Sequence, residues 1–336
     1  MTPRIVILGA GSVGCFVGGL WRHSGLDVSL IGRPPVRDGV AAAGLRLTGI
    51  GGLDVTLPPS AIPFGSAPAA LAGAGLIVLA VKSVATRQAA AEIAAHAATN
   101  TIVLSLQNGI SNVDILQQAL PGRTILRGMV GFNVAWLADG HLHRGTSGRL
   151  AVERHPLTDA LATSLRGTPG GFDLPDDALS LAWGKLLLNL NNAVNALSGR
   201  TLHAELSGRS YRRVLAASMR EALEIMAAAG ISPAKVGPLP PALLPRFVAM
   251  PDLVFNTIGL KLQKIDTHAR SSMADDFAAG RPTEIDFLNG EIVRLAGGIG
   301  RGAPVNAAIV ELVRQAEAGG RRDWTGPELL ARVGLR

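Results

Sequence analysis

Cysteine and aromatic residues are scarce in this chain of 336 residues, which has one cysteine, Cys15, and 4% aromatic residues. A single cysteine excludes an internal disulfide and a cysteine-rich metal site, and it agrees with a reducing compartment. Few aromatic rings leave little stacking surface for bases, and the arginines are scattered, so we expect no nucleic-acid partner despite a net charge of +7. A basic balance equally suits an anionic cofactor and substrate.

Long apolar runs are also missing. Hydrophobic residues make up 48% of the chain, but no stretch approaches the ~20 apolar residues of a membrane span. The N-terminus has one arginine, Arg4, followed directly by a strand and a glycine turn, without an apolar leader region or a cleavage site. We therefore expect a cytoplasmic protein without a membrane partner, and the length predicts about two domains.

One glycine-rich run organises the rest of the chain. It follows the apolar strand 5–8 and leads into a helix, and it consists of Gly9, Ala10, Gly11, Ser12, Val13 and Gly14. In such a run the first glycine permits a tight turn, the second lets a pyrophosphate approach the backbone, and the third lets helix and strand pack closely. The free N–H groups of the helix start then favour the anion. The run predicts dinucleotide binding.

The end of the second strand predicts which dinucleotide is bound. NAD sites usually place Asp or Glu there to hold the ribose 2′-hydroxyl, whereas this chain has Arg33 and Arg37 and no acid between residues 31 and 37. Arginine could hold a 2′-phosphate through charge-assisted hydrogen bonds. We expect NADPH/NADP, with Arg33 the stronger candidate and solvated loop arginines as the alternative.

Short apolar strands alternate with helical stretches over the first 130 residues, which predicts a parallel sheet covered by helices. The expected strands are 4–8, 27–31, 76–81, 101–106 and 124–130. Glycine and proline gather at 167–171, and the chain beyond reads as helical, with a proline-rich stretch of one long loop or several short turns at 233–251. We predict a Rossmann-type α/β domain over 1–168 and an all-α domain over 169–336.

Polar side chains follow two of these strands. Lys82 comes after the third strand and Asn108 after the fourth. Ligands of open α/β sheets bind at the carboxyl ends of the strands, so Lys82 could meet a phosphate and Asn108 could bridge cofactor and substrate. The pair Asn108-Gly109 is equally typical of a plain turn.

Two further segments of the first domain are predicted to form strands outside the parallel sheet's strand–helix pattern. Residues 45–57 predict a small hairpin insertion of unknown role, and 131–153 predict antiparallel strands that close the sheet. His141 and His143 would lie on one strand face, but no third ligand is near, so we predict exposed histidines and no metal site.

A polar stripe marks one helix of the second domain, expected over residues 183–197. Lys185, Asn189 and Asn192 stand at i, i+4 and i+7 among leucines and therefore share one face. Asparagines disfavour helices, and burying them is costly unless they bind something. The stripe predicts either a ligand site or a polar network between helices.

Glu284 follows a predicted helix start. Thr283 and Asp286 have the spacing of a capping box, which leaves Glu284 in the first helical turn, where a carboxylate is stabilised. Acids at helix starts are common, so this position alone does not indicate a site.

Taken together, these motifs resemble the ketopantoate reductases (2-dehydropantoate 2-reductases) over nearly the whole chain. The motifs that carry the resemblance are Gly9–Gly14, Arg33, Lys82, Gln107-Asn108-Gly109, Trp183-x-Lys185-x-x-x-Asn189, Ser271-Ser272-Met273 and Thr283-Glu284-Ile285-Asp286. The resemblance implies an NADPH-binding Rossmann domain and a helical second domain.

The resemblance also implies roles for individual residues. Lys185 matches the family's proton donor, and Glu284 matches the glutamate that supports it. Asn108, Asn189 and Ser272 match positions that contact the substrate. The family's second substrate asparagine, eight residues after the lysine, is replaced here by Ala193, and Asn192 or Asn195 could substitute for it.

Three functions follow as hypotheses. The first is NADPH-dependent reduction of 2-dehydropantoate to (R)-pantoate in pantothenate biosynthesis. The second is reduction of another 2-keto acid to a D-2-hydroxy acid, which Ala193 motivates, and the third is a non-catalytic NADP-binding sensor. We also hypothesise a homodimer.

Overall fold

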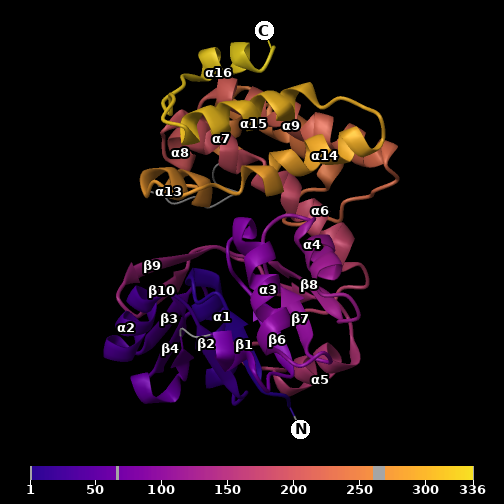
Figure 1. Ribbon diagram of the computed structural model, residues 1–336. Coiled ribbons are helices and arrows are strands. Elements are labelled where there is room, and N and C mark those ends of the chain that lie inside the picture. The colour runs from indigo at the N-terminus through magenta and orange to yellow at the C-terminus, as the bar shows by residue number, and fades with distance from the viewer. Residues whose placement is uncertain (1, 66–67, 260–268, 336) are drawn as a thin grey trace. The chain divides into compact units, whose positions relative to one another are not determined.

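The computed structural model describes residues 2–65, 68–259 and 269–335. The chain forms two compact units, Met1–Leu179 (unit 1) and Ser180–Arg336 (unit 2), coloured by residue number in Figure 1. Within the described ranges, no helix is both long enough and apolar enough to cross a membrane.

A mostly parallel sheet forms the centre of unit 1. Its seven strands lie in the order β11-β8-β7-β6-β1-β2-β5, and only the pairing of β11 with β8 is antiparallel. The strands are β1 (Ile5–Leu8), β2 (Val28–Ile31), β5 (Phe64–Gly65), β6 (Leu76–Leu79), β7 (Ile102–Ser105), β8 (Ile125–Val130) and β11 (Leu150–Val152). The five predicted parallel strands are thereby confirmed. The chain reverses its direction across the sheet at β1, which has β2 on one side and β6 on the other.

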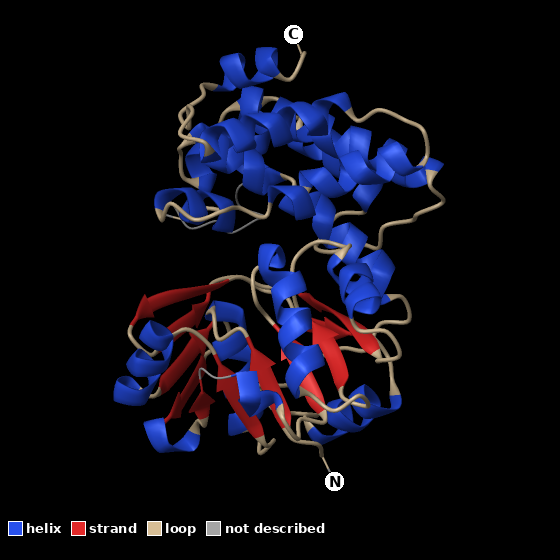
Figure 2. Cartoon of the chain, in the orientation of Figure 1, coloured by secondary structure: helices blue, strands red, loops and turns tan. Residues whose placement is uncertain are grey.

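Both faces of this sheet are covered, because its central strands are buried on both sides. In β1, Ile5 and Ile7 join one apolar cluster with Phe16 and Leu20 of α1, while Val6 and Leu8 join another with residues of α3 and α4. Figure 2 shows the helices beside the strands of unit 1. The helices and 3₁₀ turns are α1 (Ser12–His23), α2 (Pro34–Ala43), η1 (Pro59–Ala61), η2 (Pro68–Leu71), η3 (Ser83–Ala85), α3 (Thr86–His96), α4 (Asn112–Ala119) and α5 (Pro156–Ser164).

A second sheet of four strands packs beside α1. It consists of β4 (Leu53–Leu57), β3 (Leu45–Gly49), β10 (His141–Arg144) and β9 (Val134–Ala138), in that order. The predicted hairpin at 45–57 is confirmed, since β3 and β4 are antiparallel. The prediction that 131–153 closes the main sheet is wrong for β9 and β10, because β10 pairs in parallel with β3 instead. Only β11 joins the main sheet.

The described residues of unit 2 form helices and no strand, so the predicted fold class, a Rossmann-type domain followed by an all-α domain, is confirmed. Its elements are α6 (Ala178–Asn189), α7 (Asn191–Ser198), α8 (Leu202–Ser207), α9 (Arg209–Ala228), η4 (Pro241–Leu243), α10 (Leu244–Val248), α11 (Asp252–Val254), the π-helix η5 (Phe255–Gly259), α13 (Ser272–Ala278), η6 (Ile285–Phe287), α14 (Asn289–Gly298), α15 (Pro304–Glu317) and α16 (Gly326–Arg332). The proline-rich stretch 233–251, predicted as one long loop or several short turns, instead combines an irregular segment up to residue 240 with η4 and the short helix α10.

The polar stripe lies on two helices instead of one. α6 ends at Asn189 and α7 begins at Asn191, with Leu190 between them at φ −58° and ψ −23°. Leu190 keeps a right-handed helical backbone, which explains why periodicity alone predicts an unbroken helix over 183–197. Lys185 and Asn189 therefore belong to α6 and Asn192 to α7.

Candidate active site

The glycine turn between β1 and α1 has the geometry that a dinucleotide needs. Gly9 has φ +111°, and an added Cβ would lie 2.4 Å from the Val81 nitrogen. A Cβ on Gly14 would lie 2.2 Å from the Gly9 carbonyl oxygen, so helix and strand meet closely. A Cβ on Gly11 would meet no atom within 4 Å. The space over Gly11 is thus open, while the glycines on either side are constrained by packing.

The start of α1 is available to an anion. Gly11 is the N-cap, no side chain caps the helix among the described residues, and the first turn holds no acidic residue. The first amides of a helix lack partners within it and carry the positive end of the helix dipole. Open space above Gly11 and uncapped amides behind it suit the pyrophosphate of a dinucleotide.

Arg33 lies beside this turn. The N–H groups of Gly9 and Ala10 both donate to the carbonyl oxygen of Ile31, at 3.0 and 2.9 Å, so the end of β2 touches the turn. Arg33 follows two residues later as the exposed N-cap of α2. Arg37, one turn into α2, is ion-paired with Asp38 at 2.8 Å. Of the two arginines, Arg33 has the better position for a 2′-phosphate.

Lys82 and Asn108 follow β6 and β7, the next strands of the sheet. Lys82 is exposed and caps η3, and Asn108 is half-buried before Gly109, whose φ is +89°. The Asn108 carbonyl accepts from the Ser83 hydroxyl at 3.0 Å. All the predicted cofactor residues therefore lie at the carboxyl ends of β7, β6, β1 and β2, which are adjacent in that order.

A polar network that the sequence does not predict fixes the loops that carry Lys82 and Asn108. The Gln107 amide donates to the Val81 carbonyl at 3.2 Å and to the Thr86 hydroxyl at 2.7 Å. The buried Asn112 amide donates to the Asn108 carbonyl at 2.6 Å and accepts from Thr86 at 2.7 Å. The only sequence signal is that these polar residues flank the two strand ends.

Lys185 is the candidate proton donor in unit 2. It is half-buried on α6 between the buried Gly184 and Leu186. Burial lowers the pKa of its ammonium to about 8, and the negative charge of Glu284 opposes that change. Without the carboxylate the pKa would be lower still. An ammonium with a pKa near working pH can both stabilise negative charge and deliver a proton.

Glu284 is buried, 6% exposed, and is the N-cap of η6. The predicted capping box is wrong. The Thr283 hydroxyl accepts a hydrogen bond from the Ile285 N–H at 3.3 Å, and the backbone N–H of Thr283 donates to the Glu317 carboxylate. Asp286 is ion-paired with Arg314 and does not cap the helix. The α-helix begins only at Asn289. Glu284 is therefore held in a short irregular segment, with its charge acting on Lys185.

The asparagines of α6 and α7 divide into two kinds. Asn191 and Asn195 are buried: Asn191 donates to the Glu205 carboxylate at 3.1 Å, and Asn195 donates to the Arg200 carbonyl at 3.1 Å. Asn189 and Asn192 are only half-buried. The two alternatives for the stripe thus apply to different residues: Asn191 and Asn195 form the network between elements, and Asn189 and Asn192 remain the candidates for ligand contact.

Ser272 is placed next to Asn192 by its neighbour. The Ser271 N–H donates to Asn195 Oδ1 at 2.9 Å, and its hydroxyl donates to the Asn192 carbonyl at 3.1 Å. These bonds fix the start of α13 on α7 and leave the Ser272 side chain exposed. The Ser271 N–H engages Asn195 Oδ1, and Asn195 Nδ2 donates to the Arg200 carbonyl, so both ends of the Asn195 amide are used within unit 2 and Asn195 cannot take the place of the asparagine that Ala193 replaces.

The strand histidines have a structural explanation. His141 Nε2 and His143 Nδ1 lie 3.0 and 2.8 Å from the Thr48 hydroxyl of β3. Both side chains are half-buried, not exposed as predicted. Among the residues that the structure describes, no group of three or more His, Cys, Asp or Glu has an arrangement that could hold a metal.

Comparison with known proteins places both units in one protein family. The family described as ketopantoate reductase PanE/ApbA matches residues 5–156, and its C-terminal part matches residues 177–317. A 2-dehydropantoate 2-reductase of Mycobacterium tuberculosis (strain CDC 1551 / Oshkosh) is 28% identical over 322 residues, which are 95% of this chain and 99% of the relative.

Solved structures of this family and of a related fold are similar to this chain over nearly its whole length. A PanE/ApbA family ketopantoate reductase from Ralstonia eutropha JMP134 has a TM-score of 0.79 at 30% identity, covering 94% of this chain and 99% of that one. A D-mandelate dehydrogenase solved with NADH and anilino(oxo)acetate has a TM-score of 0.76 at 21% identity over 94% and 99%, and so shares the fold. Ketopantoate reductases use NADPH. The chain belongs to the ketopantoate reductase family, whose members are oxidoreductases that act on 2-keto acids.

Proposed function

We propose that this protein reduces 2-dehydropantoate to (R)-pantoate with NADPH, a step of pantothenate biosynthesis. The observation that carries the proposal is the pairing of Lys185 with Glu284, in which burial lowers the pKa of the Lys185 ammonium to about 8. A non-catalytic sensor would have no use for a partly buried lysine that is ready to give up a proton.

Lys185 has two tasks in the proposed reaction. The bound nicotinamide supplies a hydride to the 2-keto carbon, and negative charge then develops on the carbonyl oxygen. The Lys185 ammonium stabilises this charge and donates the proton that turns the oxygen into a hydroxyl. Glu284 keeps the ammonium charged and oriented, because its negative charge favours the protonated lysine.

Unit 1 has the residues that would hold the cofactor. The backbone N–H groups at the start of α1, from Ser12 and Val13 on, would bind the pyrophosphate, and the open space over Gly11 leaves room for it. Arg33 would bind the 2′-phosphate by charge-assisted hydrogen bonds, which favours NADPH over NADH. Lys82 would add a positive charge beside the same turn.

Four polar residues would bind the substrate. Asn189 on α6, Asn192 on α7 and Ser272 at the start of α13 are the half-buried or exposed members of their clusters. We assign them, with Asn108 of unit 1, to the carboxylate and hydroxyl groups of the substrate.

Ala193 favours a second candidate function. Its side chain is fully buried and has no polar atom, at the position where the family commonly has a substrate asparagine. A substrate with an apolar group in place of the distal hydroxyl of 2-dehydropantoate would need no such contact. The alternative is thus reduction of another 2-keto acid to a D-2-hydroxy acid.

A substrate panel tests the proposal. We would follow NADPH oxidation with 2-dehydropantoate, with its analogue lacking the distal hydroxyl (2-keto-3,3-dimethylbutyrate) and with 2-ketoisovalerate, and repeat each with NADH. The proposal expects the highest kcat/KM for 2-dehydropantoate. A higher kcat/KM for either compound that lacks the hydroxyl would favour the alternative function over reduction of 2-dehydropantoate. If none of the three compounds oxidised NADPH, both functions would be contradicted.

A further inference from the structure

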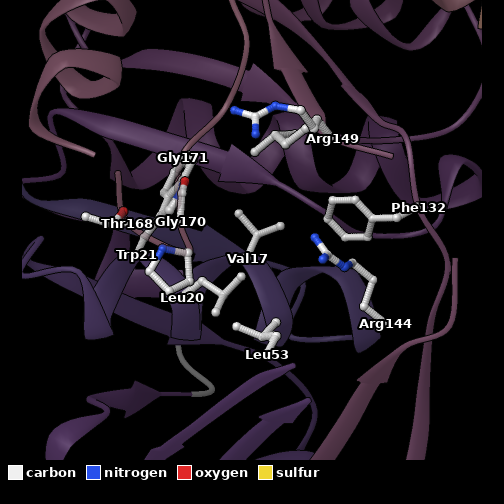
Figure 3. Close-up of a pocket in the computed structure, with 12 residues that line it drawn as sticks. Val17, Leu20, Trp21, Leu53, Phe132, Arg144, Arg149, Thr168, Gly170 and Gly171 are labelled. Atoms are coloured by element: carbon white, nitrogen blue, oxygen red, sulfur yellow. The ribbon is translucent and has the colours of Figure 1, made fainter. Parts of the chain in front are cut away.

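Unit 1 contains a cavity of about 220 Å³ that is separate from the residues of the proposed function. It lies against the middle and end of α1, and its apolar wall includes Val17, Leu20, Leu53 and Phe132. Figure 3 shows Val17 near the centre of this lining, with Phe132 and Arg144 on one side and Gly170 on the other. An engineered apolar cavity of ~150 Å³ accepts benzene, so this one has room for a ring or a branched chain of similar size.

Arg144 brings a positive charge to this apolar wall. It is half-buried at the end of β10, and its guanidinium stacks on the Phe132 ring at 5.6 Å from the ring centroid. Of its five N–H donors, one is seen to donate, from Nη2 to the Ile50 carbonyl at 3.1 Å. Within the described part of the chain it has no acidic partner, so its charge is balanced by nothing that the structure shows.

The other charge at the cavity is already neutralised. Arg149, drawn above Val17 in Figure 3, also lines the cavity and is ion-paired with Asp173 at 2.8 Å. The twelve residues that line the cavity include two arginines and no carboxylate. A half-buried guanidinium that has no carboxylate partner among the described residues, beside an apolar wall, is suited to a ligand that has one anionic group and an apolar body.

We propose that this cavity is a second ligand site, which takes a small carboxylic acid with an apolar body through the Arg144 guanidinium. The apolar body packs on Val17, Leu20 and Leu53, and the carboxylate pairs with Arg144. The site shares no lining residue with the glycine turn, Arg33, Lys82 or Asn108. The proposal goes beyond the reductase function and does not depend on it.

Trp21 provides a local signal for a test with benzoate. Its indole Nε1 donates to the Gly170 carbonyl at 2.9 Å, and both residues line the cavity. We would label the four tryptophans of the full chain with ¹⁵N, assign the Trp21 indole by Trp21→Phe, and titrate with benzoate. We expect a saturable shift of that indole signal, and much weaker binding of benzamide, which has the same shape and no charge.

Three variants test whether the Arg144 guanidinium holds the carboxylate. Arg144→Gln should weaken benzoate binding about tenfold or more, the effect of losing one charge-assisted hydrogen-bonding group. Arg46→Gln removes an exposed arginine of the same sheet that pairs with Asp54, and it should leave binding unchanged. Lys185→Ala should also bind benzoate normally, because that lysine belongs to the other unit.

Several results would overturn the proposal. They are an unshifted Trp21 signal, equal responses to benzoate and benzamide, unimpaired binding in Arg144→Gln, or loss of binding in Lys185→Ala or Arg46→Gln. If Arg144→Gln does not fold, Leu53→Trp serves instead, because it fills the cavity and keeps the arginine. Leu53→Trp should abolish the shift, and normal binding in that variant would equally contradict the site.

Discussion

The side chain of Lys185 decides whether the proposed chemistry is correct. Lys185→Ala should lower kcat about a hundredfold or more, because the general acid and the charge that stabilises the transition state are both lost. The dissociation constant of NADPH, measured by fluorescence titration, should hardly change, because the glycine turn and Arg33 hold the cofactor. A purely structural Lys185 would instead give a lower melting temperature with normal turnover per folded molecule.

The pH dependence of the reaction follows from the same pair. A proton donor must be protonated, so kcat/KM for keto-acid reduction should be constant below the pKa of about 8 and fall about tenfold per pH unit above it. Glu284→Gln removes the charge that raises this pKa, so the alkaline limb should move to lower pH. Asp286→Asn, which changes an exposed carboxylate two residues away, is the control. A limb that stays in place in Glu284→Gln would contradict the pairing.

Arg33 should set the preference between the two cofactors. Arg33→Ala removes a positive charge that only NADPH can use, through its 2′-phosphate. We therefore expect the KM for NADPH to rise about tenfold or more and the KM for NADH to change little. Arg37→Ala is the matched control, because Arg37 is ion-paired with Asp38. An equal rise in KM for NADPH and NADH would show that Arg33 does not bind the 2′-phosphate.

At the residue scale, the sequence predicts the glycine turn fully and the asparagines only in part. The turn is predictable because its requirements are local: a positive φ at Gly9 and close packing at Gly14. Asn189 and Asn191 look alike in sequence, and tertiary contacts alone make the first half-exposed and the second a partner of Glu205. The capping box at Thr283 failed for a similar reason, since the distant Glu317 accepts its N–H.

The elements of unit 2 contain a buried carboxyl group with a testable effect on stability. Glu205 of α8 is fully buried, and burial raises its pKa to about 8, while hydrogen bonds from Asn191 and Asn195 and the charge of Arg212 oppose this. A raised pKa means that the native state keeps a proton that the unfolded chain loses above its ordinary value of 4.5. This contribution to stability is complete below pH 4.5 and is lost as the pH rises to about 8.

Glu205→Gln cannot ionise and should remove that dependence. Its melting temperature relative to the parent protein should therefore rise between pH 5 and 8 and level off above that, as followed by circular dichroism. Glu224→Gln, at an exposed position of α9, should run parallel to the parent. Parallel curves for Glu205→Gln would mean that Glu205 has an ordinary pKa in the folded protein.

Strands were easier to predict than the ends and partners of other elements. Short apolar runs with a glycine at one end predict β1 and β6 because both strands are buried on two sides. The break at Leu190 is invisible in the periodicity, since its backbone stays helical. The pairing of β10 with β3 joins segments far apart in sequence, and no local pattern reports such a contact.

The whole molecule is expected to be a homodimer. Unit 2 exposes three large apolar side chains on neighbouring short elements, Leu243, Leu253 and Val254, and burying such groups favours association. Light scattering should give twice the chain mass of 34.7 kDa. Leu253→Lys, at a side chain 79% exposed, should shift the equilibrium toward the monomer without lowering the melting temperature. A mass of one chain at every concentration would end this hypothesis.

The parallel pairing of β3 with β10 also orders the events of synthesis. A ribosome that releases the chain from its N-terminus delivers the hairpin of β3 and β4 long before residues 141–144 emerge. At about 5–20 residues per second, the partner strand arrives on the order of ten seconds later. Until then one edge of β3 has no strand to pair with, and such edges recruit other chains. The nascent protein is thus prone to aggregate through this edge until residues 141–144 emerge, and any premature stop in that interval releases a fragment with the edge uncovered.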